Sequence, residues 1–360
     1  MPRPIPAAFA VPGDLSSPTG GYHYDRCLLS ALRDTGRDVA HIRLPDGFPH
    51  PSDAQMAEAC DLLAQVSADR VLIVDGLAFG ALPTDALAKI DAPIVALVHH
   101  PLAHESGLPD PEAARLRALE KANLTRAAHI LVPSPHIRDV LLADYAVDPD
   151  RITVIRPGRP DLSPQPVPAP ATPDAGAPPL ILSVGLLHPR KGHDTLIDAL
   201  SRITDQAWRA VIVGAPWAPG HADALTRQID GAGLSGRVQL AGRVERATLD
   251  RVYTEAYAFA LATRYEGYGI VFDEALIHGV PIVSTTAGAV PCTVPQDAGT
   301  LVPPEDAKGF ADALSALLQD RTLHAAQSAA ALKAGAALPL WSDAADLVGA
   351  ILDRIAGHGT

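Results

Sequence analysis

Short apolar segments alternate with longer segments of helical periodicity along the whole chain. Residues 71–74 read Val-Leu-Ile-Val, and consecutive apolar positions of this kind are typical of strands buried on both faces of a parallel sheet. Residues 22–35 have the other pattern, because their apolar side chains share one face of a helix that Gly36 would end. The members of that face are Tyr24, Cys27, Leu28, Ala31 and Leu32. The alternation of the two patterns predicts a doubly wound α/β fold.

The same patterns locate the individual elements. In the first half, strands are predicted at residues 7–11, 39–44, 70–75, 93–98, 130–133 and 152–156. In the second half, strands are predicted at 180–184, 209–213, 238–241, 257–262 and 281–285, and helices at 193–203, 222–231, 247–255, 269–278, 305–318 and 342–355. Each half therefore reads as an open α/β domain. Two such domains are predicted to face each other across a ligand-binding cleft.

Composition changes sharply between the two halves. Residues 159–179 read RPDLSPQPVPAPATPDAGAPP, which has too few large apolar side chains for a core and favours an extended connector. We therefore predict a Rossmann-like domain at residues 1–160, a Pro/Ala-rich linker at 161–178, a second Rossmann-like domain at 179–340 and a last helix within 341–360. The alternative is a long surface loop within one domain, but a length of 360 residues favours two.

The balance of charges argues against one class of partner. Lys and Arg total 29 and Asp and Glu total 41, so the net charge is -12. Nucleic acid requires basic surface that displaces counterions, and this balance argues against it. Peripheral contact with a membrane through a local basic patch stays open.

Two further observations indicate a cytoplasmic protein. The first residues, MPRPIPAAFAVPGD, lack the apolar run of a signal peptide, and no stretch approaches the length of about 18 apolar residues that a membrane span needs. Cys27, Cys60 and Cys292 are far apart and form no CxxC or Cys/His spacing. We interpret them as buried thiols in a reducing compartment.

Residues 265–276, YEGYGIVFDEAL, are the most informative segment. Glu266 lies in a glycine-containing loop, and Glu274 lies about one and a half turns into the helix that follows. A helix start carries free N–H groups and partial positive charge, which suits a diphosphate. Carboxylates suit sugar and ribose hydroxyls, because each oxygen accepts a hydrogen bond. The alternative is a pair of solvated glutamates around a helix start.

Two more segments have phosphate-binding features. In residues 183–194, SVGLLHPRKGHD, Arg190 and Lys191 follow a strand and precede a helix, where cations would neutralise phosphate charge. The alternative is a solvated basic turn. Gly20 and Gly21 lie between the first strand and the first helix, where backbone without side chains can approach a ligand closely. They do not form a GxGxxG motif, and a tight turn is the alternative.

Histidines follow another predicted strand. His99, His100, His104 and Glu105 suggest a metal at first sight, but their spacing is not HExxH and Pro101 breaks any helix there. No metal site is therefore predicted. Imidazoles that hydrogen-bond a sugar or an acceptor fit this position better.

These segments, in this order, resemble the family 4 retaining glycosyltransferases of the GT-B architecture. The resemblance covers nearly the whole chain and rests on SVGLLHPRKGHDTLIDAL, VQLAGRVERATLDRVY, YEGYGIVFDEALIHGVPIVST and GTLVPPEDAKGFADAL. It implies an N-terminal acceptor domain, a C-terminal nucleotide-sugar domain, and a last helix that crosses back onto the N-terminal domain. It also implies a nucleoside diphosphate sugar as co-substrate, with no metal and no other cofactor.

The resemblance also implies roles for individual residues. Glu274 would hold the nucleotide ribose, Glu266 the donor sugar near the reacting carbon, and Lys191 the diphosphate. Gly20 and Gly21 would close over the phosphates. Either His99 or His100 would lie near the donor sugar, and the sequence does not choose between them. The catalytic set is thus Glu266, His99, His100 and Lys191, and the other donor-binding residues are Arg190, Arg243, Val244, Gly267, Tyr268 and Gly269.

Two positions depart from the family pattern. Many members have Arg where this chain has Leu186, and Glu where it has Cys292. The predicted activity is transfer of a sugar, with retention of anomeric configuration, to an acceptor that is a lipid, a glycan or a small metabolite; UDP and GDP donors are not distinguished. The alternatives are an inactive sugar-nucleotide-binding partner subunit, which the missing Arg favours, and a sugar-nucleotide epimerase of the same architecture.

Overall fold

The computed structural model describes residues 4–17, 19–105, 107–159 and 177–357. The chain forms two compact units. Unit 1 comprises Met1–Gly158 and Pro339–Thr360, and unit 2 comprises Arg159–Leu338. The predicted linker at 161–178 lies almost entirely outside the described residues.

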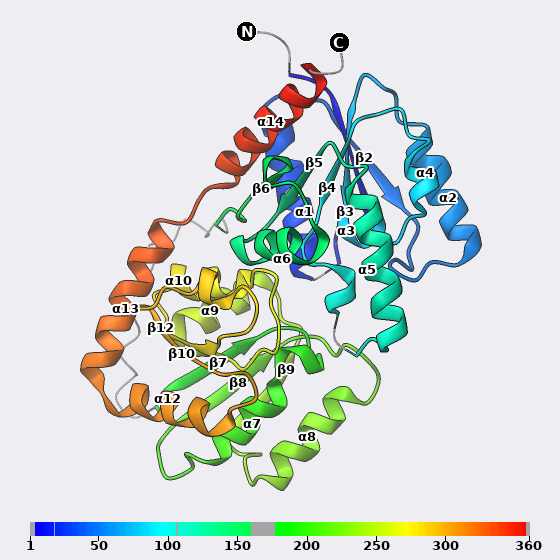
Figure 1. Cartoon of the computed structure of the whole chain (residues 1–360). Helices are drawn as coiled ribbons and strands as arrows, with labels where there is room; N and C mark the ends of the chain where they lie inside the picture. The colour runs from blue at the N-terminus through cyan, green and yellow to red at the C-terminus, as the bar shows by residue number, and fades with distance from the viewer. Residues whose placement is uncertain (1–3, 18, 106, 160–176, 358–360) are drawn as a thin grey trace. The chain divides into compact units, whose positions relative to one another are not determined.

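Unit 1 is built on a six-stranded parallel sheet with the order β2-β1-β3-β4-β5-β6 (Figure 1). Its strands are β1 (Ala7–Pro12), β2 (Val39–Leu44), β3 (Val71–Asp75), β4 (Ile94–Leu97), β5 (His129–Val132) and β6 (Ile152–Val154). Its helices are α1 (Gly20–Asp34), α2 (Asp53–Ala64), α3 (Gly76–Phe79), α4 (Thr84–Leu87), α5 (Asp110–Leu124), α6 (Pro135–Tyr145) and α14 (Trp341–Gly357), with short turns η1 (Leu102–His104) and η2 (Pro149–Arg151).

Unit 2 repeats the architecture, with a six-stranded parallel sheet in the order β12-β11-β10-β7-β8-β9. Its strands are β7 (Leu180–Val184), β8 (Arg209–Val213), β9 (Val238–Gly242), β10 (Ala256–Leu261), β11 (Ile282–Thr285) and β12 (Gly299–Val302). Its helices are α7 (His193–Ser201), α8 (His221–Gly231), α9 (Arg246–Glu255), α10 (Ile270–Ile277), α11 (Val290–Thr293), α12 (Ala307–Gln319) and α13 (Arg321–Ala336), with the turn η3 (Pro189–Lys191).

The two sheets confirm the predicted doubly wound α/β fold for both halves. Every residue of β3 and β7 is buried, which explains why these strands read as continuous apolar runs rather than alternating ones. In unit 2, α7, α8 and α12 contribute to one apolar cluster and α9, α10 and α13 to another. The sheet therefore lies between two helical layers.

Each sheet has one point at which the chain reverses its direction of growth. In unit 1 the chain passes from β1 to β2 on one side and then to β3 on the other side of β1. In unit 2 it runs β7, β8, β9 and then returns to place β10 on the other side of β7. Ligands of open parallel sheets bind beyond the carboxyl ends of the strands at such switch points. Functional side chains are therefore expected at these two edges.

The last helix belongs to unit 1, as predicted. The rings of Trp341 on α14 and Tyr24 on α1 meet edge to face, with centroids 5.2 Å apart. Arg37, which is almost fully buried, donates to Asp353 and to the carbonyl of Gly349 on α14. The backbone at Gly158 packs so closely against the start of α14 that no side chain fits there, because a Cβ at this position would lie 2.3 Å from the backbone nitrogen of Trp341. Helix α14 thus closes the core of unit 1.

Several details differ from the sequence predictions, and the short helix α11 is one of them. Strand β12 and helix α13 were not predicted; β12 has only four residues, and α13 is rich in alanine and has few large apolar side chains to mark a face. The interpretation of the cysteines as buried thiols is wrong. Among the described residues none of the three forms a disulfide, but Cys27 and Cys60 are half-buried and Cys292 is exposed.

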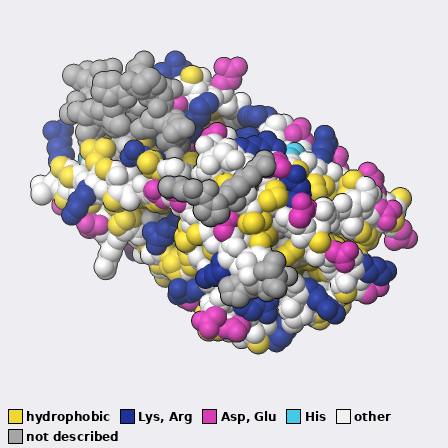
Figure 2. All heavy atoms as spheres, turned by 90° about the horizontal axis from the view of Figure 1, so that it is seen from above, with side chains coloured by type: hydrophobic (Ala, Val, Ile, Leu, Met, Phe, Trp, Pro, Cys, Tyr) yellow, Lys and Arg dark blue, Asp and Glu magenta, His cyan; other side chains and the backbone are white. Residues whose placement is uncertain are grey.

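The surface carries charges of both signs. On the face shown in Figure 2, Lys and Arg side chains are interspersed with Asp and Glu, without a continuous basic area over the described residues of that face. Within the described ranges, no single helix has the length and apolar composition of a membrane span; α13 and α14 reach it only if taken together.

Candidate functional site

The switch point of unit 2 brings Lys191 to Glu266. Lys191 ends the turn that follows β7, and Glu266 lies in the loop that follows β10, the strand next to β7. The Nζ of Lys191 lies 2.5 Å from Oε1 of Glu266, and the two side chains are 14% and 6% exposed. A charge-assisted hydrogen bond between two largely buried ions results. The structure thus brings together two of the predicted catalytic residues.

Glycines fix the backbone on both sides of this pair. Gly192 directly follows Lys191 with φ +64°, and a Cβ there would lie 1.8 Å from the carbonyl oxygen of Ala262. Gly288 has φ +57°, and a Cβ there would lie 2.3 Å from the carbonyl oxygen of Glu266. That same oxygen accepts the N–H of Ala289 at 2.8 Å. The positions of Lys191 and Glu266 therefore depend on glycines at which side chains would be strained and would collide.

Opposing effects set the charge of Glu266. Burial raises the pKa of this carboxyl. The cations Lys191 and Arg190, together with hydrogen bonds from Lys191 and Thr263, lower it by more than burial raises it, so the pKa of Glu266 is below the usual value. The hydroxyl of Thr263 lies 3.2 Å from Oε1 of Glu266. Glu266 is therefore an anion at neutral pH, held by cations that a phosphate would also attract.

The start of α10 adjoins the same carboxylate. Gly269 caps the helix with φ 90°, and a Cβ there would lie 3.7 Å from Cγ of Glu266. The preceding residue, Tyr268, is buried; its hydroxyl donates to Asp273 at 2.7 Å and its carbonyl accepts from Thr293 at 2.7 Å. The backbone at the helix start is thus anchored, and its N–H groups add partial positive charge near Lys191 and Glu266.

Glu274 lies farther along α10 and has different partners. Its Oε1 pairs with the guanidinium of Arg246, and its Oε2 accepts the hydroxyl of Tyr253 at 3.0 Å. Both partners come from α9, and Arg243 and Val244 directly precede that helix. Glu274 is 7% exposed, whereas the side chain of Arg246 is 44% exposed. The second glutamate therefore faces the β9–α9 connection, in contact with residues that the sequence did not single out.

The remaining predicted residues of unit 2 surround this arrangement. Arg190 is half-buried and donates to the carbonyl of Tyr265 at 3.4 Å. Leu186, where many family members have Arg, is half-buried, and its carbonyl lies 3.2 Å from Nε2 of His193. Burial lowers the pKa of His193 to about 4, so this histidine is neutral and donates. Cys292 is exposed on α11.

Unit 1 places His99 beside the glycine turn. Gly20 and Gly21 form the first turn of α1, after the N-cap Thr19. A Cβ on Gly21 would lie 3.5 Å from Cδ2 of His99. The Nε2 of His99 lies 2.8 Å from Oδ1 of Asp25, one turn further along α1, and 3.5 Å from Oδ2 of Asp75 at the end of β3. Neither aspartate was among the predicted site residues.

His100 and His104 contact other residues. The Nε2 of His100 lies 3.0 Å from Oε2 of Glu105 within the same loop, and that of His104 lies 3.8 Å from Asp144 on α6. Among the described residues, the group with the spacing of metal ligands is Asp25, Asp75 and His99, whose ligand-type atoms lie within 4.8 Å of one another. The histidine cluster that the sequence suggested does not come together in this way.

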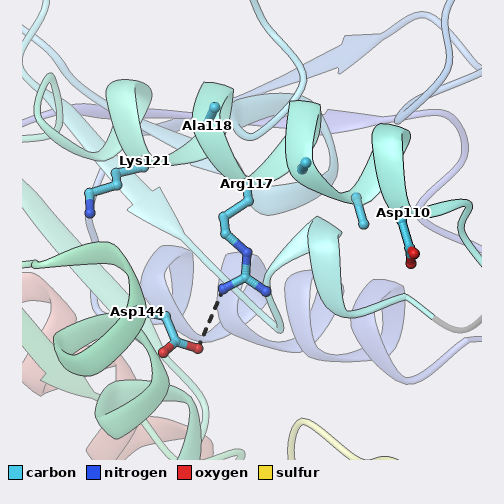
Figure 3. Close-up of a pocket in the computed structure, with 7 residues that line it drawn as sticks. Asp110, Arg117, Ala118, Lys121 and Asp144 are labelled. Atoms are coloured by element: carbon cyan, nitrogen blue, oxygen red, sulfur yellow. Dashed lines mark ion pairs between the residues drawn. The ribbon is translucent and has the colours of Figure 1, made fainter.

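A separate pocket is lined by residues of α5 and by Asp144 near the end of α6. Its volume is about 440 Å³, and Figure 3 shows Arg117 and Lys121 extending from α5, with Asp144 opposite. Arg117 pairs with Asp144 at 3.5 Å and lies over the ring of Tyr145. Three alanines of α5, Ala113, Ala114 and Ala118, also line it. The pocket therefore combines two cations with small apolar side chains.

Two signals in the sequence would have identified the residues that were missed. Asp75 directly follows the buried run Val71–Val74, so it stands at the carboxyl end of a central strand. Asp25 lies one helical turn before Leu29 on the buried side of α1, where a charge is unexpected without a function or a partner. Arg246 had no such signal, because its contact with Glu274 depends on how α9 packs against α10.

Comparison with known proteins covers both units. Residues 16–160 match the family model described as Glycosyltransferase Family 4, and residues 178–320 match the model described as Glycosyl transferases group 1. The chain is 31% identical over 256 residues to D-inositol 3-phosphate glycosyltransferase of Xylanimonas cellulosilytica, which covers 65% of this chain and 60% of that protein. The chain thus spans less than two thirds of that relative.

Two further proteins extend the comparison. The GDP-mannose-dependent alpha-(1-6)-phosphatidylinositol monomannoside mannosyltransferase of Mycobacterium tuberculosis is 32% identical over 166 residues, which is 43% of this chain and 42% of that protein. The crystal structure of HepE from Anabaena, in complex with UDP, has the same fold, with a TM-score of 0.74, 17% identity, and coverage of 97% of this chain and 100% of HepE. With both halves matched, the chain belongs to the family 4 glycosyltransferases of the two-domain GT-B architecture.

Proposed function

We propose that this protein transfers a sugar from a nucleoside diphosphate sugar to an acceptor hydroxyl, with retention of anomeric configuration. One observation carries the proposal: Lys191 and Glu266 form a buried ion pair at the switch point of unit 2, beside the start of α10. A cation, a helix start and a carboxylate at one sheet edge match the chemistry of a sugar diphosphate.

In this proposal, different residues of unit 2 bind different parts of the donor. Lys191, Arg190 and the N–H groups that follow Gly269 stabilise the negative charge that develops on the leaving diphosphate, which is electrostatic preorganisation. Glu266 accepts hydrogen bonds from the donor sugar. Glu274 accepts hydroxyls of the ribose, and Arg243 and Val244, at the start of the same α9 connection, contact the rest of the nucleotide.

In the proposed reaction, Lys191 changes its partner when the donor binds. In the structure, Nζ of Lys191 donates to Oε1 of Glu266. An arriving diphosphate offers more negative charge, so the lysine is shared between carboxylate and phosphate, and Glu266 gains lone pairs for sugar hydroxyls. The acceptor oxygen forms its bond to the anomeric carbon directly while the bond from that carbon to the diphosphate breaks, and the leaving phosphate oxygen takes the proton of the acceptor hydroxyl. The proposed reaction therefore uses neither a nucleophile nor a general base from the protein.

We assign the role of the N-terminal histidine to His99 rather than to His100. His99 lies beside Gly21 and is fixed by Asp25, whereas His100 pairs with Glu105 in its own loop. Gly20 and Gly21 would let the backbone approach the phosphates closely. This assignment predicts that His99→Ala lowers turnover far more than His100→Ala does.

For the acceptor, we propose an inositol-containing compound. The names of two relatives give inositol 3-phosphate and a phosphatidylinositol mannoside as acceptors. Both acceptors carry a phosphate, and the pocket on α5 offers Arg117 and Lys121 as cations (Figure 3). Transfer to inositol phosphate but not to inositol, with the preference lost in Arg117→Ala, would support this acceptor class. Equal use of both compounds would count against it.

A ligand screen tests the donor site directly. A nucleoside diphosphate sugar at about 100 times its dissociation constant is expected to stabilise the fold by about 2.7 kcal/mol, with or without EDTA. Both UDP and GDP sugars belong in the screen, since HepE was solved with UDP and one relative is named for GDP-mannose. A shift that EDTA abolishes, or no shift with any common donor, would contradict the proposed site.

Two variants test the division of roles between the glutamates. Glu274→Ala is expected to weaken binding of the free nucleoside diphosphate, because the ribose is present in it. Glu266→Ala is expected to spare that binding and to reduce sugar transfer. Equal losses of nucleotide affinity would contradict the division. Release of nucleoside diphosphate only when acceptor is present separates a transferase from an epimerase, and binding without any turnover would indicate an inactive partner subunit.

A further inference from the structure

Unit 1 contains two buried carboxylates beside His99: Asp25, which already served to distinguish His99 from His100, and Asp75, to which the proposed chemistry gives no role. Asp25 on α1 is 1% exposed, and Asp75 at the end of β3 is 2% exposed. Both approach one atom, because Nε2 of His99 lies 2.8 Å from Asp25 and 3.5 Å from Asp75. Burial of an ionised carboxylate costs several kcal/mol unless it is compensated. One imidazole therefore faces two groups that both require positive charge.

Among the described residues, His99 is the only cation whose charge acts on the pKa of Asp75. In the described part of the chain, the charges that act on the pKa of His99 are those of Asp25 and Asp75. The other titratable groups around the cluster are the phenols of Tyr22 and Tyr24 on α1 and the His100–Glu105 pair. Asp75 also accepts the N–H of Leu77 at 3.0 Å, from the start of α3. Protons must therefore provide the balance of charge within the cluster.

The cluster is attached to the glycine turn through the imidazole ring. Gly21 and Asp25 are four residues apart, and thus lie on one face of α1. The His99 ring packs along that face, in van der Waals range of a Cβ on Gly21 and with its centroid 5.1 Å from that of Tyr24. About a fifth of the His99 side chain stays exposed. The edge of the His99 ring that carries Nε2 is held by Asp25 and Asp75, while another part of the ring remains accessible to solvent.

We propose that Asp25 and Asp75 are positioning residues, which hold the imidazole of His99 against the first turns of α1 and share protons with it as one unit. The proposal depends on the proposed function only for the substrate that His99 meets. It extends the site by two residues and gives it a dependence on pH.

The direction of that dependence follows from the charges. Burial, with a contribution from Asp25, raises the pKa of Asp75 to about 7. Burial lowers the pKa of His99, but the Asp25 and Asp75 charges raise it more, so it stays above the usual value. At slightly acidic pH the unit contains a His99–Asp25 ion pair and a neutral Asp75. As pH rises, Asp75 ionises, and an uncompensated negative charge forms beneath His99, where it opposes an anionic donor.

The test is a titration of the histidine C–H signals by NMR in the full chain, without substrate, with His99→Gln to assign the signal. We expect His99 to titrate above 6.5, the ordinary value, and Asp25→Asn to lower its midpoint by about one pH unit or more. Asp75→Asn should lower it less. Asp139→Asn, which removes an exposed carboxylate of the same unit, should leave it unchanged.

Several outcomes would overturn the proposal. One is a wild-type His99 midpoint below 6.5, which decides the matter even if Asp25→Asn fails to fold. Another is an unchanged midpoint in both variants. A third is displacement of the His99 signal by stoichiometric Zn²⁺, which would assign the cluster to a metal ion instead.

A second readout separates positioning from mere stability. The KM for the donor is expected to rise several-fold above pH 7 in the wild type and to stay flat in Asp75→Asn, whose amide mimics the protonated carboxyl. A wild-type KM that is equally flat would contradict the effect on the donor. If no donor supports turnover, the proposed function fails while the NMR titration still decides the proton sharing.

Discussion

Lys191 and Glu266 are 75 residues apart in sequence, yet their charged atoms lie 2.5 Å apart at the edge between β7 and β10. Removal of one partner leaves the other charge buried, whereas removal of both does not. We expect Lys191→Met to lower the free energy of unfolding by about 3 kcal/mol and the double variant with Glu266→Gln to recover most of that loss. Urea denaturation of the four proteins gives the coupling energy, and strictly additive losses would contradict a buried pair.

The same pair has a defined pH dependence. The pKa of Glu266 is lower in the folded protein than in the unfolded chain, so its contribution to stability is present above the unfolded value and is lost as pH falls through the folded one. The difference in stability between wild type and Glu266→Gln should therefore shrink below about pH 4. A difference that is constant from pH 7 to pH 3 would show that Glu266 is not stabilised as an anion.

Arg246 occupies an oxygen of Glu274 that a ribose hydroxyl would use. Since the arginine is 44% exposed, the pair is worth about 1 kcal/mol at most. We expect Arg246→Ala to tighten binding of the nucleoside diphosphate by up to about fivefold and to reduce the dependence of that binding on salt, as measured by calorimetry. Arg251→Ala, which removes an exposed charge from the same helix, is the control. Weaker binding in Arg246→Ala would mean that the guanidinium itself contacts the nucleotide.

Gly288 lies against the backbone of Glu266. A Cβ at this position would meet the Glu266 carbonyl and strain a backbone with φ +57°. Gly233 also has a positive φ, but a Cβ there would meet nothing within 4 Å. Gly233→Ala should therefore show strain alone, about 1 kcal/mol. Gly288→Ala should cost more and should reduce donor binding as well. Equal effects of the two substitutions on stability and binding would show that the Glu266 loop tolerates the collision.

Helix α14 is expected to be required for the stability of unit 1. Gly158→Ala would drive a methyl group into the backbone at Trp341, whereas a Cβ on Gly357, near the end of the same helix, would meet nothing within 4 Å. Hydrogen exchange should show lost protection in β1 and α1 for Gly158→Ala and for a chain cut before Trp341, but not for Gly357→Ala. Unchanged protection of unit 1 in the truncated chain would contradict the packing.

The sequence was informative wherever one segment carried its own signal. The buried run of β3, the basic turn at Lys191 and the glycine loop at Glu266 each combine a local pattern with a position at the end of a strand, so both the sheet and part of the site could be predicted. Strand β12 could not, because GTLV is short and is followed by two prolines. Its place in the sheet comes from pairing with β11.

Contacts between distant segments were beyond the reach of sequence patterns. The Asp25–Asp75–His99 cluster requires that β3 lie between β1 and β4, and nothing in the three local sequences fixes that order. For the same reason, the sequence could not decide between His99 and His100. Adjacent histidines look alike in sequence, and only the packed ring distinguishes the one beside Gly21.

The division of unit 1 into Met1–Gly158 and Pro339–Thr360 has a consequence for biosynthesis. A ribosome synthesises the whole of unit 2 before it makes α14, so the chain contains every element of the core of unit 2 at a stage when unit 1 still lacks the helix that covers Tyr24 and binds Arg37. Domains generally fold as units during synthesis, the N-terminal one first, but here the half that emerges first is the half that must wait. A released chain that ends before Trp341 would therefore resist protease in unit 2 and remain sensitive to it in unit 1.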